Sequence, residues 1–136
     1  MASKNAIIIT GATGWLGKCA IQCFQSNEDF EDNELILFAS STKKILFKNR
    51  EFQVHDFLNY DLELLQNREI LGIVHLAFLT REKLALIGYK NYCEINKQIT
   101  SRIGQFLTDF QPEWVTTVSS GAINLDDADR KSTRLN

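Results

Sequence analysis

The sequence predicts an α/β fold built on a doubly wound parallel sheet that breaks off after about the fifth strand. Apolar runs of strand length alternate with longer segments of helical periodicity, the order typical of βαβ units. The clearest apolar runs are continuous, as expected of parallel strands that are covered on both faces. The chain has 136 residues, of which 44% are hydrophobic and 24% charged, an ordinary composition for one globular domain.

The amino-terminal part predicts two strands and the helix between them. A strand is expected over about 6–10, a helix over about 15–26 and a second strand over 34–40, "ELILFAS". The helix carries a stripe of small and apolar residues at spacings of three and four, which predicts one face buried on the core. This stripe consists of Leu16, Cys19, Ala20, Cys23 and Phe24. Within it, both cysteines are interpreted as small buried hydrophobes.

The middle of the chain, residues 42–69, is harder to assign. "KILF" and "EFQVHDF" could each be a short strand, and "DLELLQN" is a candidate for a helix of two turns. A buried strand follows in "EILGIVHLAF" and is expected to end near Ala77. Apolar residues spaced by three and four then predict a long helix from Tyr92 to Phe110, closed by Pro112. "EWVTTVSSGA", rich in β-branched residues, predicts the last strand.

The carboxyl-terminal tail is polar and is predicted to lie outside the fold. Residues 126–136 form this tail, and 129–136, "DRKSTRLN", match the translation of a common sequencing-library adapter. We therefore interpret 129–136 as a translated adapter and exclude it from the predicted fold. The alternative is a natural disordered terminus. Residues 1–125 are expected to be an incomplete domain of a longer parent protein.

Charge and hydropathy argue against several classes of function. The net charge is −2, the pI is about 5.7 and the basic residues are scattered, so no nucleic-acid partner is expected. The apolar runs are too short to span a membrane or to form a signal peptide, which predicts a cytoplasmic protein without a membrane partner. The three cysteines and two histidines lack ligand spacing, so no metal site is predicted.

The segment "TGATGWLG" joins the first predicted strand to the first helix and carries glycines three residues apart. Gly11 permits a sharp turn, Gly14 lets an anion approach the backbone, and Gly17 lets the helix lie close to the strand. The helix amino terminus offers free N–H groups to phosphate. The pattern predicts a Rossmann-type, dinucleotide-binding domain over 1–125, with Thr13, Trp15 and Leu16 also in the phosphate loop.

Together, the motifs resemble the extended branch of the short-chain dehydrogenase/reductase superfamily, the NAD-dependent epimerase/dehydratase family. "TGATGWLG" is similar to the family's TGxxGxxG loop, "VHLAF" to its V-x-H-x-A strand end, "INKQIT" to its helix with an Asn, and "VSSGA" to its Ser-Ser strand end. In a parallel sheet these strand ends meet at the edge where ligands bind. The resemblance covers nearly all of 5–123.

The resemblance implies roles for particular residues. The backbones of Trp15 and Leu16 would contact the pyrophosphate, and Leu76 and Ala77 would contact the cofactor. Asp56 would bind the adenine amine, although a turn aspartate after a strand is an equal alternative. Further along the chain, Asn96 would support the site, with a solvated helix position as the alternative. Ser120 would be the catalytic serine that orients a substrate hydroxyl, with a hydroxyl that satisfies a strand-end backbone group as the alternative. His75 and His55 receive no chemical role.

The sequence departs from the family at the catalytic pair. The family uses Tyr-x-x-x-Lys, in which the lysine lowers the tyrosine pKa, and this spacing is not found in the sequence. Asn124 and Leu125 also stand where many relatives have Tyr-Gly. The resemblance therefore implies the NAD(P)-binding part of an epimerase, dehydratase or reductase that transfers hydride on a sugar nucleotide or a similar hydroxyl or keto substrate. The chain itself is expected to be inactive.

Cofactor choice is read from the end of the second strand. "FASSTKK" has no acid to hold the ribose hydroxyls, while Ser40 and Lys43 could accept the 2′-phosphate, so NADP is slightly favoured over NAD. Partners expected for the parent are the dinucleotide and a small-molecule substrate, and the parent could form a homodimer. Two other functions remain open: a non-catalytic NADP-binding sensor of the same superfamily and a small nucleotide-binding α/β protein.

Overall fold

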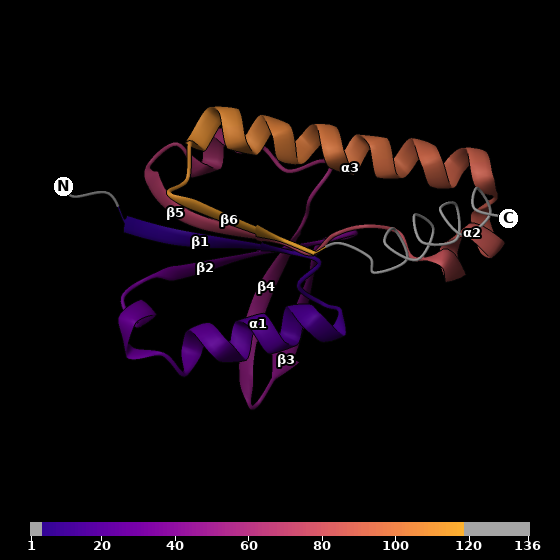
Figure 1. Ribbon diagram of the computed structural model, residues 1–136. Helices are drawn as coiled ribbons and strands as arrows, with labels where there is room; N and C mark the ends of the chain where they lie inside the picture. Colours follow the sequence, from indigo (N-terminus) through magenta and orange to yellow (C-terminus); the bar gives the residue numbers. More distant parts are fainter. Residues whose placement is uncertain (1–3, 119–136) are drawn as a thin grey trace, which may run out of the picture.

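A computed structural model of the chain describes residues 4–118 (Figure 1). The strands are β1 (Lys4–Thr10), β2 (Glu34–Ala39), β3 (Lys43–Phe47), β4 (Arg50–Asp56), β5 (Arg68–His75) and β6 (Trp114–Thr117). The helices are α1 (Trp15–Gln25), α2 (Arg81–Ile87) and α3 (Tyr89–Phe110), and two short 3-10 turns span Glu28–Phe30 and Leu62–Leu65. The segments predicted as strands and long helices therefore form in the predicted order.

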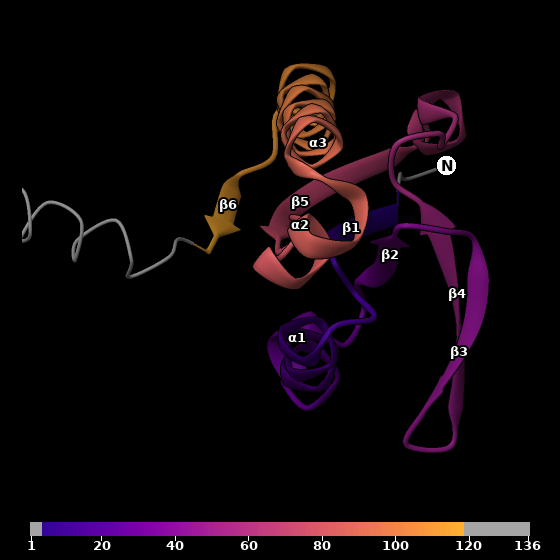
Figure 2. The same ribbon diagram turned by 90° about the vertical axis from the view of Figure 1, so that its right-hand side faces the viewer.

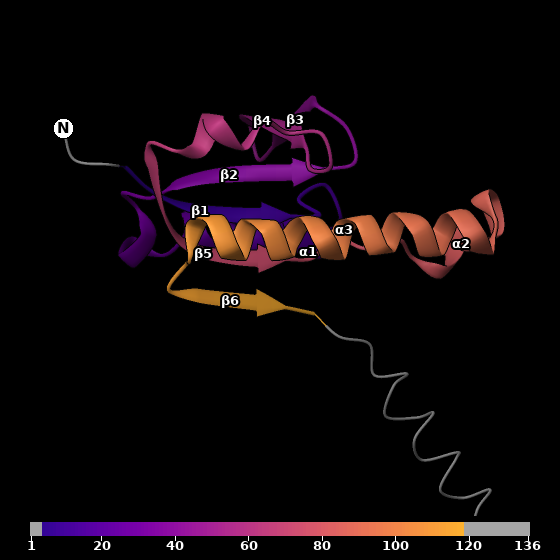
Figure 3. The ribbon, with the colours of Figure 1, turned by 90° about the horizontal axis from the view of Figure 1, so that it is seen from above.

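The strands form one sheet of six strands in the order β3-β4-β2-β1-β5-β6. Every neighbouring pair is parallel except β3 and β4, which form an antiparallel hairpin. Figure 3 shows β2, β1, β5 and β6 side by side, with their arrowheads at the same edge. The architecture is mixed α/β and compatible with a Rossmann-like fold. It has one strand more than predicted, because 42–69 contributes two.

The sheet is covered on both faces, by α3 on one side and α1 on the other (Figure 2). Successive residues of β1 point to opposite faces, so Ala6 and Ile8 join the core under α3, while Ile7 and Ile9 join the core under α1. Phe106 of α3 is fully buried in the first of these cores. Burial on two faces explains why the apolar run of β1 is continuous.

The β3–β4 hairpin turns at Lys48 and Asn49, which both have positive φ, 49° and 64°. Two successive positive φ values are typical of the tight turn whose twist suits a hairpin. Ile45 and Phe47 of β3 pack toward the core under α1. The sequence indicated two short strands here, but Lys-Asn is a weak signal for such a turn, so the hairpin itself was not predicted.

The buried face of α1 differs from the predicted stripe. Gly17 and Ile21 are buried, and Ala20 and Phe24 are partly buried, whereas Leu16, Cys19 and Cys23 of the predicted stripe are exposed. The prediction that these cysteines are buried hydrophobes is therefore wrong. Gly17 packs against the preceding loop, and its side of the helix faces the core. A pattern that counts only apolar side chains does not include a glycine.

The long carboxyl-terminal helix α3 is confirmed and begins three residues before Tyr92, after Gly88 at φ 85°. It ends at Gln111, which adopts the left-handed conformation (φ 44°) and is followed by Pro112. "DLELLQN" forms only a 3-10 turn. The strand β5 ends at His75, two residues before the predicted end.

Candidate functional site

The first glycine of the phosphate-loop motif lies where two chain segments touch. Gly11 has φ +67°, and a Cβ added to it would lie 2.8 Å from the carbonyl carbon of Leu76. Only glycine therefore suits this turn. The contact brings the end of β1 against the segment after β5, so that two of the predicted site segments meet.

Gly17 and Gly14 meet opposite requirements. A Cβ on Gly17 would lie 2.3 Å from the Gly11 carbonyl oxygen, so its absence lets α1 begin directly against the loop. A Cβ on Gly14 would meet only that same oxygen, at an ordinary 3.5 Å, and Gly14 is exposed. Gly17 thus serves packing, whereas the space beside Gly14 is open for a ligand.

The amino terminus of α1 has no side-chain cap. Gly14 is the N-cap, no side chain accepts a hydrogen bond there, and the first turn contains no acid. The first intrahelical bond of the loop runs from Lys18 N–H to the Gly14 carbonyl, at 3.0 Å. The amides of Trp15, Leu16 and Gly17 precede it and have no place in the i→i−4 ladder. Both Trp15 and Leu16 are exposed, and Thr13 lies half-buried in the loop.

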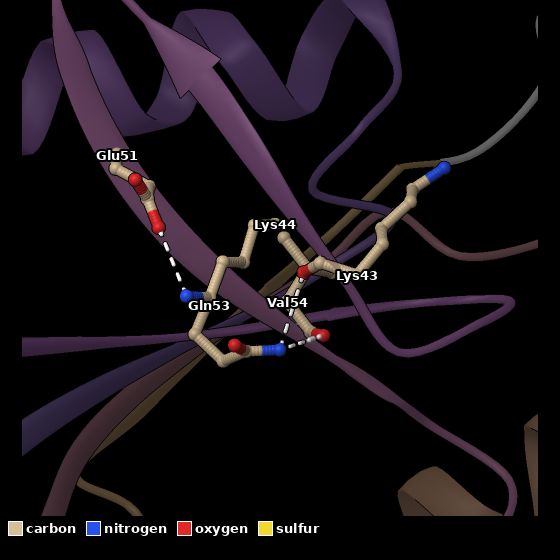
Figure 4. A network of polar contacts seen from close by, with 5 residues as sticks. All are labelled: Lys43, Lys44, Glu51, Gln53 and Val54. Carbon is tan, nitrogen blue, oxygen red and sulfur yellow. Dashed lines mark hydrogen bonds and ion pairs between the residues drawn. The ribbon is translucent and has the colours of Figure 1, made fainter.

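The loop is attached to β2 by a hydrogen bond from Ala12 N–H to the Phe38 carbonyl, at 3.0 Å. The exposed Ser40 follows the end of β2, and Lys43 begins β3. Among the residues described, Lys43 has no ion-pair partner, whereas Lys44 pairs with Glu51 at 3.3 Å. In Figure 4 the ammonium of Lys43 points away from that pair.

The amide of Gln53 holds the backbone at the start of β3. Its Nε2 donates to the carbonyls of Lys43 and Val54, both at 3.2 Å (Figure 4). Lys43 is thus anchored by its backbone while its long side chain remains exposed. Sequence reasoning did not identify Gln53, because its role depends on the cross-strand pairing.

Asp56 takes part in a local turn. One carboxylate oxygen accepts from Leu58 N–H at 3.2 Å, and the other accepts from Asn59 Nδ2 at 3.0 Å. These are the bonds of a turn aspartate. A carboxylate has further lone pairs, so the adenine contact stays a prediction.

Thr10 connects the ends of β1 and β5. The residue is fully buried, and its hydroxyl oxygen accepts from the N–H groups of Leu76 and Ala77 at 3.0 and 3.1 Å. The same hydroxyl lies 2.7 Å from Nδ1 of His75. The amides of Leu76 and Ala77 are therefore already engaged, and their expected contact with a cofactor would have to use other atoms.

Asn96 supports the segment after β5, and its expected role at a cofactor site stays a prediction. Its Oδ1 accepts from Leu79 N–H at 2.8 Å, which ties this segment to α3. Next to this contact lies a cavity of about 490 Å³ at the carboxyl ends of β5 and β6. The cavity is lined by Leu16, His75, Ala77, Phe78, Asn96, Ile99, Thr100, Thr117 and Val118.

Both histidines are partly buried, and burial lowers the pKa of each below the usual 6.5. His75 lies in the cavity wall. Thr10 and Thr100 were not proposed as site residues. The signal available for Thr10 was a polar residue that ends an otherwise apolar strand directly before the glycines.

Some predictions fall on residues outside the described range. Ser120, the expected catalytic serine, and the tail 126–136 lie there. Within residues 4–118 no group of three or more His, Cys, Asp or Glu side chains is placed to hold a metal ion. None of the helices in this range is both long and apolar enough to cross a membrane.

The structure thus brings the glycine loop, the end of β2 and the segment after β5 to one edge of the sheet. Of the predicted residues, Leu16, Ala77 and Asn96 line the cavity there. Gly14 borders the open amino terminus of α1, and Lys43 lies further along, at the start of β3. No protein-family model matches the sequence, and no curated protein matches it significantly.

Proposed function

We propose that the chain is the NAD(P)-binding part of an epimerase, dehydratase or reductase that transfers hydride on a sugar nucleotide or a similar hydroxyl or keto substrate. In this proposal the fold is of the Rossmann type. The observation that carries the proposal is the uncapped amino terminus of α1, with exposed Gly14 beside it.

A diphosphate matches this terminus in charge and in hydrogen bonding. Free amides of the first turn and the positive end of the helix dipole, about half an elementary charge, both favour an anion. The first turn has no acid to repel it. Close backbone contacts surround Gly11 and Gly17 in this loop.

The cavity between β5, β6 and α3 favours the proposal of a long ligand, because it offers space for the part of the ligand beyond the phosphates. Leu16 belongs to both regions, since it lies in the first turn of α1 and lines the cavity. A bound NAD(P) would supply the hydride donor or acceptor. The described residues would bind and orient it, and the proposed role of Ser120 would be to hold the reacting oxygen.

Binding without turnover is expected of this chain, because its sequence has no Tyr-x-x-x-Lys. A non-catalytic sensor would behave in the same way. The enzyme and the sensor can be distinguished by adding to this chain a segment that carries the Tyr-x-x-x-Lys pair. The measurement is reduction of a keto substrate. Turnover on adding that segment supports the enzyme, and continued binding without turnover supports the sensor.

The decisive experiment replaces the open glycine. Gly14→Val adds a side chain where the fold has room, and it should lower NADP⁺ affinity at least about tenfold, or about 1.4 kcal/mol. Gly104→Val is the matched control, because a Cβ there meets nothing within 4 Å on α3. Calorimetric titration of both variants measures the effect. Equal affinities would refute a phosphate seat at this terminus.

The NADP preference is tested at the start of β3. Lys43→Gln should lower NADP⁺ affinity several-fold and leave NAD⁺ affinity unchanged, because a charged hydrogen bond to the 2′-phosphate is lost. Lys44→Gln is the control, since that lysine already pairs with Glu51. An equal effect of both substitutions would indicate general attraction of anions instead of recognition by Lys43.

A further inference from the structure

The hydrogen bonds of Thr10 assign the position of the proton on His75. A hydroxyl offers two acceptor sites and one proton. Both acceptor sites of Thr10 Oγ1 are used by the N–H groups of Leu76 and Ala77. The proton is then left for the remaining partner, Nδ1 of His75, at 2.7 Å. Nδ1 therefore accepts, and the neutral ring carries its own proton on Nε2.

This network also opposes a positive charge on His75. A protonated ring would bring an Nδ1–H group toward an oxygen whose acceptor sites are taken, and the threonine proton would lose its acceptor. Burial acts in the same direction and lowers the His75 pKa. Among the described residues that line the cavity there is no charged side chain to offset this. The Nε2–H group is thus a donor, not a base.

Asn96 adds a second donor to the same cavity. Its Oδ1 is occupied by Leu79 N–H, so its amide has two N–H bonds left to offer. The Thr100 hydroxyl donates to the backbone carbonyl of Asn96 at 3.0 Å, so it leaves the Asn96 side chain free of this bond. The remaining wall is largely apolar, with Leu16, Ala77, Phe78, Ile99 and Val118 among its residues.

We infer that this cavity binds an uncharged group bearing a carbonyl oxygen, which accepts a hydrogen bond from Nε2–H of His75. Neutral donors and apolar walls favour such a group over a carboxylate, which no described lining residue would neutralise. The inference deepens the proposed function, and it rests on that function only for the source of the carbonyl. The carbonyl could belong to the carboxamide of a bound dinucleotide or to a keto substrate.

The tautomer is measured directly by NMR on the full chain with ¹⁵N-labelled histidine. At neutral pH, the two ring nitrogens of His75 should show Nε2 protonated and Nδ1 unprotonated. Thr10→Ser keeps the hydroxyl and should preserve this spectrum, whereas Thr10→Val should allow the other tautomer. A wild-type ring with its proton on Nδ1, or a charged ring at neutral pH, would overturn the inference.

Ligand class is tested with small probes and the same NMR signals. Nicotinamide and cyclohexanone are uncharged carbonyl compounds from the two sources, and nicotinate is the charged counterpart of nicotinamide. At least one of the uncharged probes should shift the Nε2–H signal. The affinity for nicotinate should be lower by at least about tenfold. A shift by nicotinamide alone indicates the carboxamide, and a shift by cyclohexanone alone indicates a keto substrate. No shift with either, or equal binding of nicotinate, contradicts the inference.

Substitutions at His75 complete the test. His75→Gln can place an amide N–H near the position of Nε2 and should retain much of the affinity for the uncharged probe. His75→Phe keeps a ring without a donor and should lose about tenfold. Equal affinities of wild type and His75→Phe would refute the donor role. Titration with 2′,5′-ADP, which lacks the carboxamide, separates the two proposals: if it does not bind while the carbonyl probe does, only the proposed dinucleotide function fails.

Discussion

The two ends of β5 differ in chemistry although α3 runs beside both. At the amino end lies a cavity of about 730 Å³, whose lining includes the charged side chains of Glu63, Arg68, Glu69 and Asp109. At the carboxyl end lies the smaller cavity of about 490 Å³, where the described lining is uncharged and includes His75. The larger cavity is therefore the more charged of the two.

The larger cavity therefore differs from the proposed site in charge as well as in size. The Arg68 guanidinium already pairs with Glu34, with Nε 2.5 Å from the carboxylate, which raises the Arg68 pKa. The other charged side chains that line this cavity, Glu63, Glu69 and Asp109, are all acidic. The carboxyl end instead combines the uncapped helix terminus, neutral hydrogen-bond donors and apolar walls. The carboxyl end depends on close backbone contacts and buried hydrogen bonds. Substitutions there should therefore change the free energy of unfolding more than substitutions at the partly exposed ion pair of the amino end.

The largest expected effect is at Gly17. Gly17→Ala places a Cβ 2.3 Å from the Gly11 carbonyl oxygen, and backbone atoms must move to admit it. We expect a loss of ~2–4 kcal/mol in the free energy of unfolding, measured by urea denaturation. Gly104→Ala, at an open helix position, should be neutral or up to ~1 kcal/mol more stable. Similar losses in both variants would contradict the close packing of α1.

Thr10→Val should have the next largest effect. It removes the hydroxyl that serves Leu76 N–H, Ala77 N–H and the His75 ring, and each buried group left without a partner costs ~1–3 kcal/mol. We expect a total loss of ~2–3 kcal/mol, since the Leu76 amide also lies 3.3 Å from the Thr10 carbonyl. Thr10→Ser is the control and should retain most of the stability. If valine and serine variants unfold at the same urea concentration, the hydroxyl has no structural role.

A smaller effect is expected from the pH dependence contributed by His75. Burial lowers its folded-state pKa below 6.5, so in mildly acidic solution the unfolded chain binds the proton first. Stability from this group is full above about pH 6.5 and falls as the pH decreases toward the folded-state pKa. Between about pH 7.5 and about pH 5.5, wild type should lose more unfolding free energy than His75→Gln. An equal loss in the two proteins would show that His75 titrates normally.

The smallest effect should come from the amino end of β5. Glu34 and Arg68 form a partly exposed pair, with 29% and 34% of their side-chain surfaces accessible. Glu34→Gln should cost no more than ~1 kcal/mol, and the cost should shrink in ~1 M salt. Thermal unfolding at low and high salt measures it. A loss larger than that of Thr10→Val would reverse the contrast between the two ends.

Local sequence patterns were sufficient for β1, β2, β5, β6, α1, α3 and the glycine loop, but they did not predict α2. The continuous apolar run of β1, the glycines that follow it and the periodicity of α3 were each visible within a short window. Gly11 and Gly17 have the geometry predicted for them, a positive φ and a close helix approach. These features depend on steric requirements of the backbone within a few residues, and such requirements leave a readable residue choice.

Other features could not be read locally. Cys19 and Cys23 matched a buried stripe, yet α1 buries Gly17 and Ile21 and leaves both cysteines exposed. Asp56 suited either a ligand contact or a turn, and residue type alone could not separate the two. The hairpin of β3 and β4 depended on a Lys-Asn turn that carries no strong signal.

The contact between Thr10 and His75 joins residues 65 positions apart, and it follows from the register of β1 against β5. That register shifts between Ala6 and Ile7, so Ile70 and Gly72 face consecutive residues of β1. Side chains alternate along a strand, and one skipped residue changes which of them share a face. Local patterns therefore indicated the central strands, the two long helices and the glycine loop. The donor-lined cavity arose from long-range strand pairing, whose register no short stretch of sequence contains.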